Sequence, residues 1–398
     1  MATRREFLGA TAGLVGGAAI EVGPLGPQQP SIGADRFDPW IEIIAENLRH
    51  NVEVTSRMAG GRRIIAVVKN NGYGLGLAQV GRLFDAHPSV TALAVVRFGE
   101  ALVLREAGVG KPILVMARTT EGEAVELVRR DVRLALLGDD APDFCRRVAE
   151  RAARPVGVHL YLDTGMSRMG HPIGRAAEWV AEVAKERVRI EGAFTELTED
   201  PDFDREQVGK LTALAEQARG RGITLGPLHA ASSAGVDHQP ETHLDLVRPG
   251  FMLYGGLVSP EARDKKELRA AVRLRARVVR VEQLQPGEGV SYHRRWKATR
   301  PTWVAALPLG HVDGFPSGAT KGCEILINGK LYPVVGSVSA SHTIVAIGDQ
   351  PEVKVGDLAT IMGPDHPSVH PDTVASRAEY SDYGIYFHLS PMLPRVVV

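Results

Sequence analysis

Short apolar runs alternate with amphipathic segments between residue 64 and about residue 254. Runs rich in Val, Ile and Leu are typical of buried strands, and they occupy 64–68, Ala92–Val96, Ile113–Met116, Leu134–Leu137, Val156–Leu162, Ile190–Phe194 and Gly226–His229. Segments between them, among them Phe98–Ala107, Ala141–Ala153 and Ile173–Glu186, resemble amphipathic helices. Repeated strand-then-helix units favour a parallel sheet, with enough units here for a closed (β/α)8 TIM-like barrel.

A different pattern follows Pro260. Apolar and polar residues then alternate in short runs separated by Pro-Gly, Asn-Gly and Gly-Asp turns, which is typical of an all-β domain. The predicted strands are Val272–Gln283, Thr302–Leu307, Glu324–Ile327, Tyr332–Val338, Thr343–Ile347 and Leu358–Met362. We therefore predict a barrel over residues 37–265 and a β-rich C-terminal domain over residues 266–398.

Residues 1–36 read as an export signal and linker. The run Thr3-Arg4-Arg5-Glu6-Phe7-Leu8 precedes a mildly apolar stretch, Gly9 to Ile20, that is too short to span a bilayer. This arrangement resembles a twin-arginine signal, so we expect a periplasmic protein without a membrane anchor. However, Gly9 stands where such signals usually have lysine, and no A-x-A cleavage site precedes Pro24. The alternative is a disordered tail on a cytoplasmic protein.

The charge balance argues against nucleic acid and anionic membrane as partners. Lys plus Arg and Asp plus Glu both number 47 among the 398 residues, so the formal net charge is zero. A small polar substrate fits such a chain better. The two cysteines, Cys145 and Cys323, have neither a CxxC nor a Cys/His spacing, so no metal site is predicted, and one disulfide stays possible.

One lysine stands where a barrel carries its chemistry. The apolar run from Ile64 to Val68 ends at Lys69, and three glycines follow within seven residues. The C-terminal ends of barrel strands form the catalytic face. A lysine in a partly apolar mouth loses its proton more easily and can form a Schiff base with a carbonyl cofactor. Taken alone, Lys69 could equally be a surface lysine before an ordinary turn.

The stretch Ala66–Gly76 resembles the cofactor-lysine motif of alanine racemases, which are fold-type III pyridoxal phosphate enzymes. Further matching motifs follow in the family's order at Leu162–Gly170, His229–Ala234, Val247–Gly255 and Gly289–His293. The resemblance extends from about residue 37 to the C-terminus, and it places the strand and helix within 37–51 at the start of the barrel. It implies pyridoxal 5'-phosphate as the cofactor.

The resemblance also implies roles for individual residues. Lys69 would bind the cofactor and act as one base, and Tyr292 of the partner subunit in a homodimer would be the other. Arg168 would contact the cofactor's phenolic oxygen and the substrate. Arg248 would face the ring nitrogen; because arginine keeps its proton, the ring becomes a weaker electron sink, which suits proton removal and return. The residues implied at the phosphate are Tyr73, Ser233, Gly250, Phe251 and Tyr383.

Several positions depart from the family pattern. The replacements are Tyr161 for a lysine, often carbamylated, that supports the arginine; Glu196 for a histidine facing the ring; His311 for a tyrosine; Ala340 and Ser341 for a Met-Asp pair near the substrate carboxylate; and Gly384 for a glutamate. The substrate side is therefore altered more than the cofactor side. Because alanine is smaller than methionine, Ala340 is expected to leave a wider entrance to the substrate pocket.

These observations predict racemisation of alanine, or of a broader range of amino acids, by a two-base mechanism at active sites shared between two subunits. The first alternative is a pyridoxal phosphate-dependent lyase or aldolase acting on D-amino acids, because Pro364–Pro367 and His370 faintly resemble the metal corner of such enzymes. The second is a cofactor-binding homologue that has lost catalysis. The sequence does not identify the preferred amino acid.

Overall fold

The computed structural model describes residues 36–256 and 267–398. The predicted export signal, nearly all of the linker and the predicted domain boundary at 265/266 lie outside these ranges. Among the described helices, none is long and apolar enough to cross a membrane. Cys145 and Cys323 are buried free thiols, so the possible disulfide does not form.

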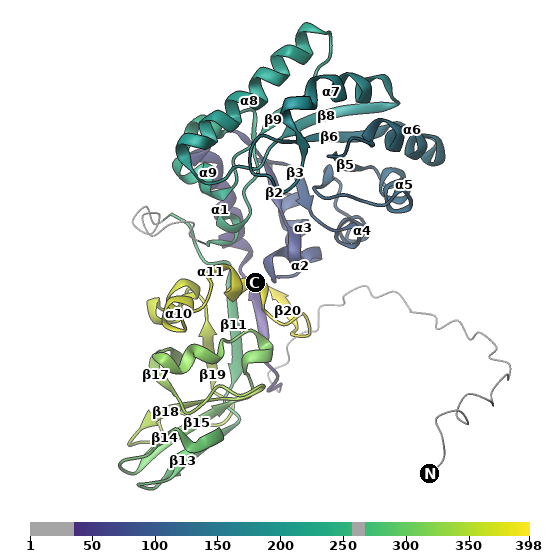
Figure 1. Ribbon diagram of the computed structural model, residues 1–398. Helices are drawn as coiled ribbons and strands as arrows, with labels where there is room; N and C mark the ends of the chain where they lie inside the picture. Colours follow the sequence, from purple (N-terminus) through teal and green to yellow (C-terminus); the bar gives the residue numbers. More distant parts are fainter. Residues whose placement is uncertain (1–35, 257–266) are drawn as a thin grey trace, which may run out of the picture.

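The first described range, apart from its N-terminal strand, forms the predicted barrel (Figure 1). Its eight described parallel strands are β2 (Arg63–Val67), β3 (Val90–Val95), β4 (Ile113–Val115), β5 (Val132–Leu136), β6 (Val156–Asp163), β8 (Val188–Phe194), β9 (Leu228–His229) and β10 (Leu246–Val247). The pairing of β5 with β6 closes the ring, and the short β7 (His171–Pro172) extends β6. This confirms the predicted fold class.

Helices surround these strands because each connection between parallel neighbours crosses over the sheet. They are α1 (Ala45–Met58), α3 (Leu77–Asp85), α4 (Phe98–Glu106), α5 (Glu121–Arg129), α6 (Ala141–Ala152), α7 (Ala176–Lys185), α8 (Pro201–Gly220) and α9 (Ser233–His238). The strands are covered on both faces, and Ile64 to Val67 of β2 are accordingly buried in succession. A continuous apolar run therefore predicts the strand here, where an alternating pattern would not.

The C-terminal domain is a mainly antiparallel sheet, as predicted, with nine strands in the described part of the chain. Their order is β12 (Arg280–Leu284), β15 (Thr302–Leu307), β18 (Thr343–Gly348), β17 (Lys330–Val335), β16 (Glu324–Ile327), β19 (Leu358–Met362), β11 (Val272–Arg277), β1 (Trp40–Ile43) and β20 (Arg395–Val397). A small ribbon, β13 (Gly289–Val290) with β14 (Trp296–Lys297), and the helices α10 (Pro371–Arg377) and α11 (Asp382–Phe387) complete it.

Two expectations about strands need correction. The strand at Trp40–Ile43, expected at the start of the barrel, pairs antiparallel with β11 and parallel with β20, so it belongs to the C-terminal sheet. The single strand expected at Val272–Gln283 is two strands, β11 and β12, which pair with different neighbours. In both cases the local pattern identifies a strand, but partners distant in sequence decide its sheet.

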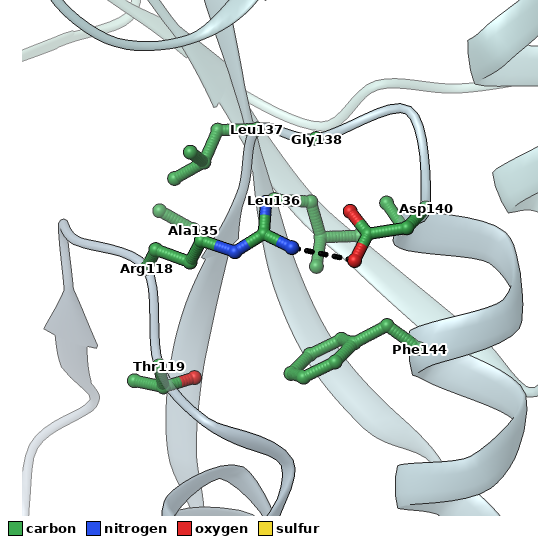
Figure 2. Close-up of a pocket in the computed structure, with 9 residues that line it drawn as sticks. Arg118, Thr119, Ala135, Leu136, Leu137, Gly138, Asp140 and Phe144 are labelled. Carbon is green, nitrogen blue, oxygen red and sulfur yellow. Dashed lines mark hydrogen bonds and ion pairs between the residues drawn. The ribbon is translucent and has the colours of Figure 1, made fainter.

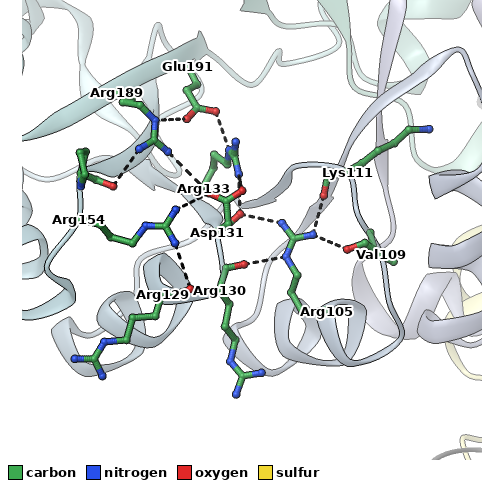
Figure 3. A network of polar contacts seen from close by, with 11 residues as sticks. Arg105, Val109, Lys111, Arg129, Arg130, Asp131, Arg133, Arg154, Arg189 and Glu191 are labelled. Carbon is green, nitrogen blue, oxygen red and sulfur yellow. Dashed lines mark hydrogen bonds and ion pairs between the residues drawn. The ribbon is translucent and has the colours of Figure 1, made fainter.

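Arginines hold together the N-terminal ends of the barrel strands, away from the catalytic face (Figure 3). Arg105 donates to the carbonyls of Val109 at 2.7 Å, Lys111 at 2.9 Å, Arg130 at 3.0 Å and Asp131 at 2.9 Å. The Asp131 carboxylate then accepts hydrogen bonds from Arg133 at 2.8 Å and Arg154 at 3.1 Å. Because these contacts join several consecutive βα units, we infer that this end of the barrel contributes to the stability of the fold.

Candidate functional site

A left-handed turn follows β2 and carries Lys69, which lies two residues beyond the strand end. Residues Asn70, Asn71, Gly72 and Tyr73 have φ of 54°, 58°, 61° and 53°. Asn and Gly adopt this conformation at least cost, whereas a tyrosine there is strained. The turn folds the chain back immediately after the strand. It leaves the half-buried Lys69 side chain at the mouth of the barrel.

Three side chains hold this turn, two of them from residues distant in sequence. The Glu100 carboxylate of α4 accepts hydrogen bonds from the Asn70 N–H at 2.6 Å and the Val96 N–H at 3.2 Å. The Asn71 side chain accepts from the Leu77 N–H at 3.0 Å. From the far end of the chain, Arg395 donates twice to the Gly74 carbonyl, at 3.0 and 2.7 Å. The sequence motif does not predict these contacts, because their partners lie outside it.

A cavity of about 370 Å³ opens at this end of the barrel. Its lining includes eight of the residues predicted for the site: Lys69, Tyr73, Arg168, Ser233, Arg248, Gly250, Phe251 and Tyr383. They come from the segments that follow β2, β6, β9 and β10 and from α11. The volume lies within the usual range for cofactor pockets. Val96, Met116, Met169 and Glu199 also line the cavity and were not predicted.

One end of the cavity presents hydroxyls and backbone N–H groups. The Ser233 hydroxyl accepts from the N–H groups of Gly250 at 3.1 Å and Met252 at 3.3 Å. A Cβ atom at Gly250 would lie 2.1 Å from the Tyr73 hydroxyl oxygen, so only glycine allows this close approach. Burial raises the pKa of Tyr73, which keeps its phenol protonated and able to donate. Hydroxyls and N–H groups gathered beside a glycine fit a phosphate.

Aromatic rings form the wall beside this end. The Tyr73 ring stacks on Tyr254 with centroids 4.5 Å apart, and the Phe251 ring stacks on Tyr383 at 4.2 Å. Tyr383 belongs to α11, which packs against the lysine turn. The predicted C-terminal tyrosine therefore reaches the cavity of its own chain.

Arg248 is buried at the base of the cavity. Its guanidinium donates to the Thr195 carbonyl at 3.1 Å, the Glu196 carboxylate at 2.9 Å and the His229 Nδ1 at 3.0 Å. Arginine can only donate, so His229 Nδ1 must accept, and the His229 proton lies on Nε2. That proton is then donated to Nδ1 of His159, 2.9 Å away. A buried chain of two neutral imidazoles thus fixes the orientation of the Arg248 guanidinium.

Glu196 lies between the two predicted arginines. One carboxylate oxygen is 2.9 Å from Arg248, and the other is 3.6 Å from Arg168, whose side chain is 59% exposed. Burial lowers the pKa of Lys69 below its ordinary value, an effect that Arg168 and Arg248 reinforce and Glu196 opposes. Tyr161, which stands where the family commonly has a lysine, stacks on Phe194 and hydrogen-bonds Arg168.

The structure does not bring Tyr292 or Ala340 to this cavity. Tyr292 is 70% exposed and begins the short turn η5 (Tyr292–Arg294) between β13 and β14, at the end of the molecule away from the barrel (Figure 1). The Ser291 hydroxyl donates to the Ser337 carbonyl at 2.9 Å, and the Val312 N–H donates to the Ala340 carbonyl at 3.2 Å. These hydrogen bonds join the segments that carry Tyr292, His311 and Ala340, and we call these segments the C-terminal cluster. Lys69 of the same chain is not part of it.

The residues that suggested a lyase have structural contacts instead. Asp365 accepts from Arg273 at 2.7 Å and Thr360 at 2.8 Å, and His366 Nδ1 accepts from the Ser368 N–H at 3.0 Å. Within residues 36–256 and 267–398, no group of three or more His, Cys, Asp or Glu side chains is arranged to hold a metal ion. This corner gives the lyase alternative no support.

A second hollow lies beside the ends of β4 and β5 (Figure 2). Arg118 and Asp140 point toward each other across it and pair at 2.5 Å, with Phe144 below the pair and Leu136 beside it. Its volume is about 30 Å³, roughly that of one water molecule. It is too small for a substrate, so the larger cavity is the candidate active site.

Family models match both domains of the chain. Residues 43–258 match the alanine racemase N-terminal domain, and residues 271–397 match the alanine racemase C-terminal domain. An alanine racemase of Desulforamulus reducens is 34% identical over 367 residues, which cover 90% of this chain and 98% of that protein. An alanine racemase of Desulfovibrio desulfuricans is 32% identical over 370 residues, with the same coverage.

Solved structures give the same result for the fold. Alanine racemase of Clostridium difficile superposes with a TM-score of 0.84 at 26% identity, covering 90% of this chain and 95% of that one. Alanine racemase of a D-cycloserine-producing Streptomyces lavendulae gives 0.83 at 29% identity, covering 91% and 97%. The similarity thus extends through both domains and their arrangement.

Proposed function

Because the chain belongs to the alanine racemase family, we propose that it racemises alanine and larger amino acids with pyridoxal 5'-phosphate, using Lys69 of one subunit and Tyr292 of its partner as the two bases. One observation carries the proposal: Lys69, two arginines and a phosphate-type cradle line a single cavity at the C-terminal ends of the barrel strands. Bound pyridoxal phosphate would supply the electron sink that stabilises negative charge at the substrate Cα.

The chain's own residues would orient the cofactor. Ser233, Tyr73 and the N–H of Phe251 would hold its phosphate, and Arg168 its phenolic oxygen. Arg248 would hold the ring nitrogen. Because Arg248 is charged, buried and fixed by three acceptors, it would not transfer a proton to that nitrogen. With its nitrogen unprotonated, the cofactor ring would be a weaker electron sink. Negative charge at Cα would then be short-lived, which favours removal and return of a proton over reactions that need further steps.

Lys69 would remove or return the Cα proton on one face of the substrate. Its lowered pKa raises the fraction of neutral amine near neutral pH, and a neutral amine is the form that accepts a proton. Inversion needs a second group on the opposite face. Tyr292 is exposed and distant from its own cavity, so we assign that role to the Tyr292 of a second subunit in a homodimer.

The substrate range follows from the C-terminal cluster. Ala340 and Ser341 present small side chains, so the entrance they line in a dimer would accept amino acids larger than alanine. A pocket wall that lacks a large side chain rejects larger substrates only weakly. We therefore expect alanine to be accepted without a strong preference.

Export is a separate proposal. We propose that the twin-arginine segment at Arg4 and Arg5 directs the folded, cofactor-loaded enzyme to the periplasm. Fractionation of cells expressing the wild-type chain and an Arg4→Lys/Arg5→Lys variant tests it. Equal amounts of periplasmic protein from both chains would refute it.

The reaction itself is tested by incubating the purified holoenzyme with single L-amino acids in D2O. We expect D-enantiomers that carry deuterium at Cα, from alanine and from larger amino acids. Carbon–carbon cleavage or release of CO2 would instead identify a lyase. Bound cofactor with no change in any amino acid would identify a homologue without catalysis.

A further inference from the structure

The Glu196 carboxylate links two arginines that follow different strands. Glu196 follows β8, Arg248 follows β10, and Arg168 lies in the loop after β6. The carboxylate approaches Arg248 to 2.9 Å through one oxygen and Arg168 to 3.6 Å through the other. Its backbone is fixed as well, because Gln207 of α8 donates to the Glu196 carbonyl at 3.0 Å. The acid is therefore held in place independently of its partners.

The two arginines depend on this carboxylate to different degrees. Arg248 is buried and has further acceptors in Thr195 and His229. Arg168 is mostly exposed, and among the described residues Glu196 is the only carboxylate within 4.0 Å of its guanidinium. Tyr161 also hydrogen-bonds Arg168, but an exposed arginine that loses its carboxylate partner still samples more rotamers. Glu196 therefore decides where Arg168 points far more than it decides the position of Arg248.

We propose that Glu196 is a positioning residue: it ties the exposed Arg168 to the fixed Arg248 and balances the positive charge that faces Lys69. The proposal rests on the proposed function, in which all three basic residues act on the cofactor or substrate. Glu196 thus gives Arg168 a charged partner in addition to its hydrogen bond with Tyr161, which stands where the family commonly has a lysine.

The charges around Lys69 give the proposal a measurable consequence. Arg168 and Arg248 lower the pKa of the amine, whereas Glu196 and Glu100 raise it. Glu100 is engaged by two backbone N–H groups, so it stays in place when Glu196 changes. Replacing Glu196 with glutamine removes the negative charge that offsets the effect of both arginines on the Lys69 amine. The pKa of Lys69 must then fall further.

The test measures Lys69 directly in the full-length protein freed of cofactor. Trace acetylation with acetic anhydride across pH, followed by peptide mapping, gives the midpoint at which Lys69 becomes reactive. In the Glu196→Gln variant we expect this midpoint to fall by roughly half a pH unit or more. The control is Glu199→Gln, which removes a carboxylate from the same cavity lining without an ion pair to either arginine among the described contacts; its midpoint should match wild type.

A second readout reports on Arg168. Modification by phenylglyoxal, mapped to the Arg168 peptide, should become severalfold faster in Glu196→Gln. In Glu196→Asp the charge is kept but the side chain is too short to span both arginines, so Arg168 should react faster while the Lys69 midpoint stays near wild type. An unchanged midpoint in Glu196→Gln, an equal shift in Glu199→Gln, or an unchanged Arg168 rate would overturn the proposal. Racemisation in D2O is scored separately, so its failure would count against the proposed function alone.

Discussion

Lys69 is the residue on which the proposed chemistry depends, and it can be distinguished from other lysines by cofactor attachment. Lys69→Ala should abolish both the cofactor absorbance band and turnover, because Lys69 is the only lysine among the described residues that line the cavity. Borohydride reduction of the wild-type holoenzyme, followed by peptide mapping, should mark Lys69.

Lys111 provides the matched control. Burial also lowers the pKa of Lys111, but this residue precedes β4 at the opposite end of the barrel. Lys111→Ala should keep the cofactor band. A reduced cofactor found on Lys111, or on any lysine other than Lys69, would show that the site is assigned wrongly.

Two buried histidines make stability depend on pH. Burial lowers the pKa of His159 from 6.5 to about 4, and burial also lowers that of His229. The unfolded chain therefore binds protons between these values while the folded chain does not. The contribution of these neutral histidines to the free energy of unfolding is fully present above pH 6.5 and is lost as the pH falls toward 4. For His159 the loss amounts to about 3 kcal/mol.

Urea unfolding at pH 7 and at pH 5 measures this loss. We expect wild type to lose more unfolding free energy over that interval than His159→Gln, which keeps a polar side chain but does not titrate. Equal losses in the two proteins would mean that His159 is not neutral in the folded state.

Ala340 carries the prediction about substrate range. Ala340→Met should narrow the entrance and raise the ratio of kcat/KM for alanine to that for a larger amino acid by roughly tenfold or more. The comparison uses purified dimers of wild type and variant with the same panel of L-amino acids. If wild type already prefers alanine strongly and the variant behaves identically, Ala340 does not determine the range.

Sequence motifs identify the residues of the cavity better than the contacts that hold them. Lys69, Arg248 and Gly250 follow strand ends, where a local motif specifies position. In the sequence, Glu196 is only a departure from the family pattern. Nothing in its segment indicates that it pairs with Arg168, which follows another strand. Glu100 and Arg395 were missed because their partners lie 30 and 321 residues away in sequence.

At the scale of elements, the C-terminal strand β20 holds the lysine turn. Arg395 begins β20 and is buried, yet its hydrogen bonds go to backbone carbonyls, including Gly74 and Leu393 at 2.7 Å each. Arg395→Gln should cost about 1–3 kcal/mol, because buried carbonyls lose their donors. The turn should also become more sensitive to proteolysis. Urea unfolding and limited proteolysis provide the measurements.

Arg57→Gln is the control for the arginine clamp. Arg57 pairs with Glu267, and the two side chains are 59% and 60% exposed. Such a surface pair contributes little, so this variant should change the unfolding free energy by less than about 0.5 kcal/mol. Equal effects of the two substitutions would contradict a clamping role for Arg395.

The same strand shows where prediction of the fold from sequence ends. Helices and strands of the barrel are local patterns, and most lie within a few residues of the predicted bounds. The position of Trp40–Ile43 is not local, because β1 completes a sheet whose other strands come from the last third of the chain. Hydrophobic pattern identifies a strand, whereas its partners are chosen by packing between distant segments.

At the scale of the whole molecule, the proposed site is divided between two separate parts of the chain. The cavity with Lys69 lies in the barrel, and the C-terminal cluster with Tyr292 lies in the β-rich domain, at its end away from the barrel (Figure 1). A single chain cannot place Tyr292 opposite its own Lys69 without rearranging its domains. The proposed two-fold dimer would join each cavity to the partner's cluster and leave both chains unchanged.

Mixing two inactive variants tests this central claim most directly. Lys69→Ala and Tyr292→Phe chains are each purified as inactive dimers, exchanged under mild denaturant and assayed for Cα deuteration of L-alanine in D2O. A heterodimer contains one cavity with an intact Lys69 and an intact partner Tyr292, so activity should return to at most about a quarter of the wild-type level when exchange is random. No recovery despite mass-spectrometric proof of heterodimers, or full activity of wild type as a monomer in sedimentation, would contradict the shared site.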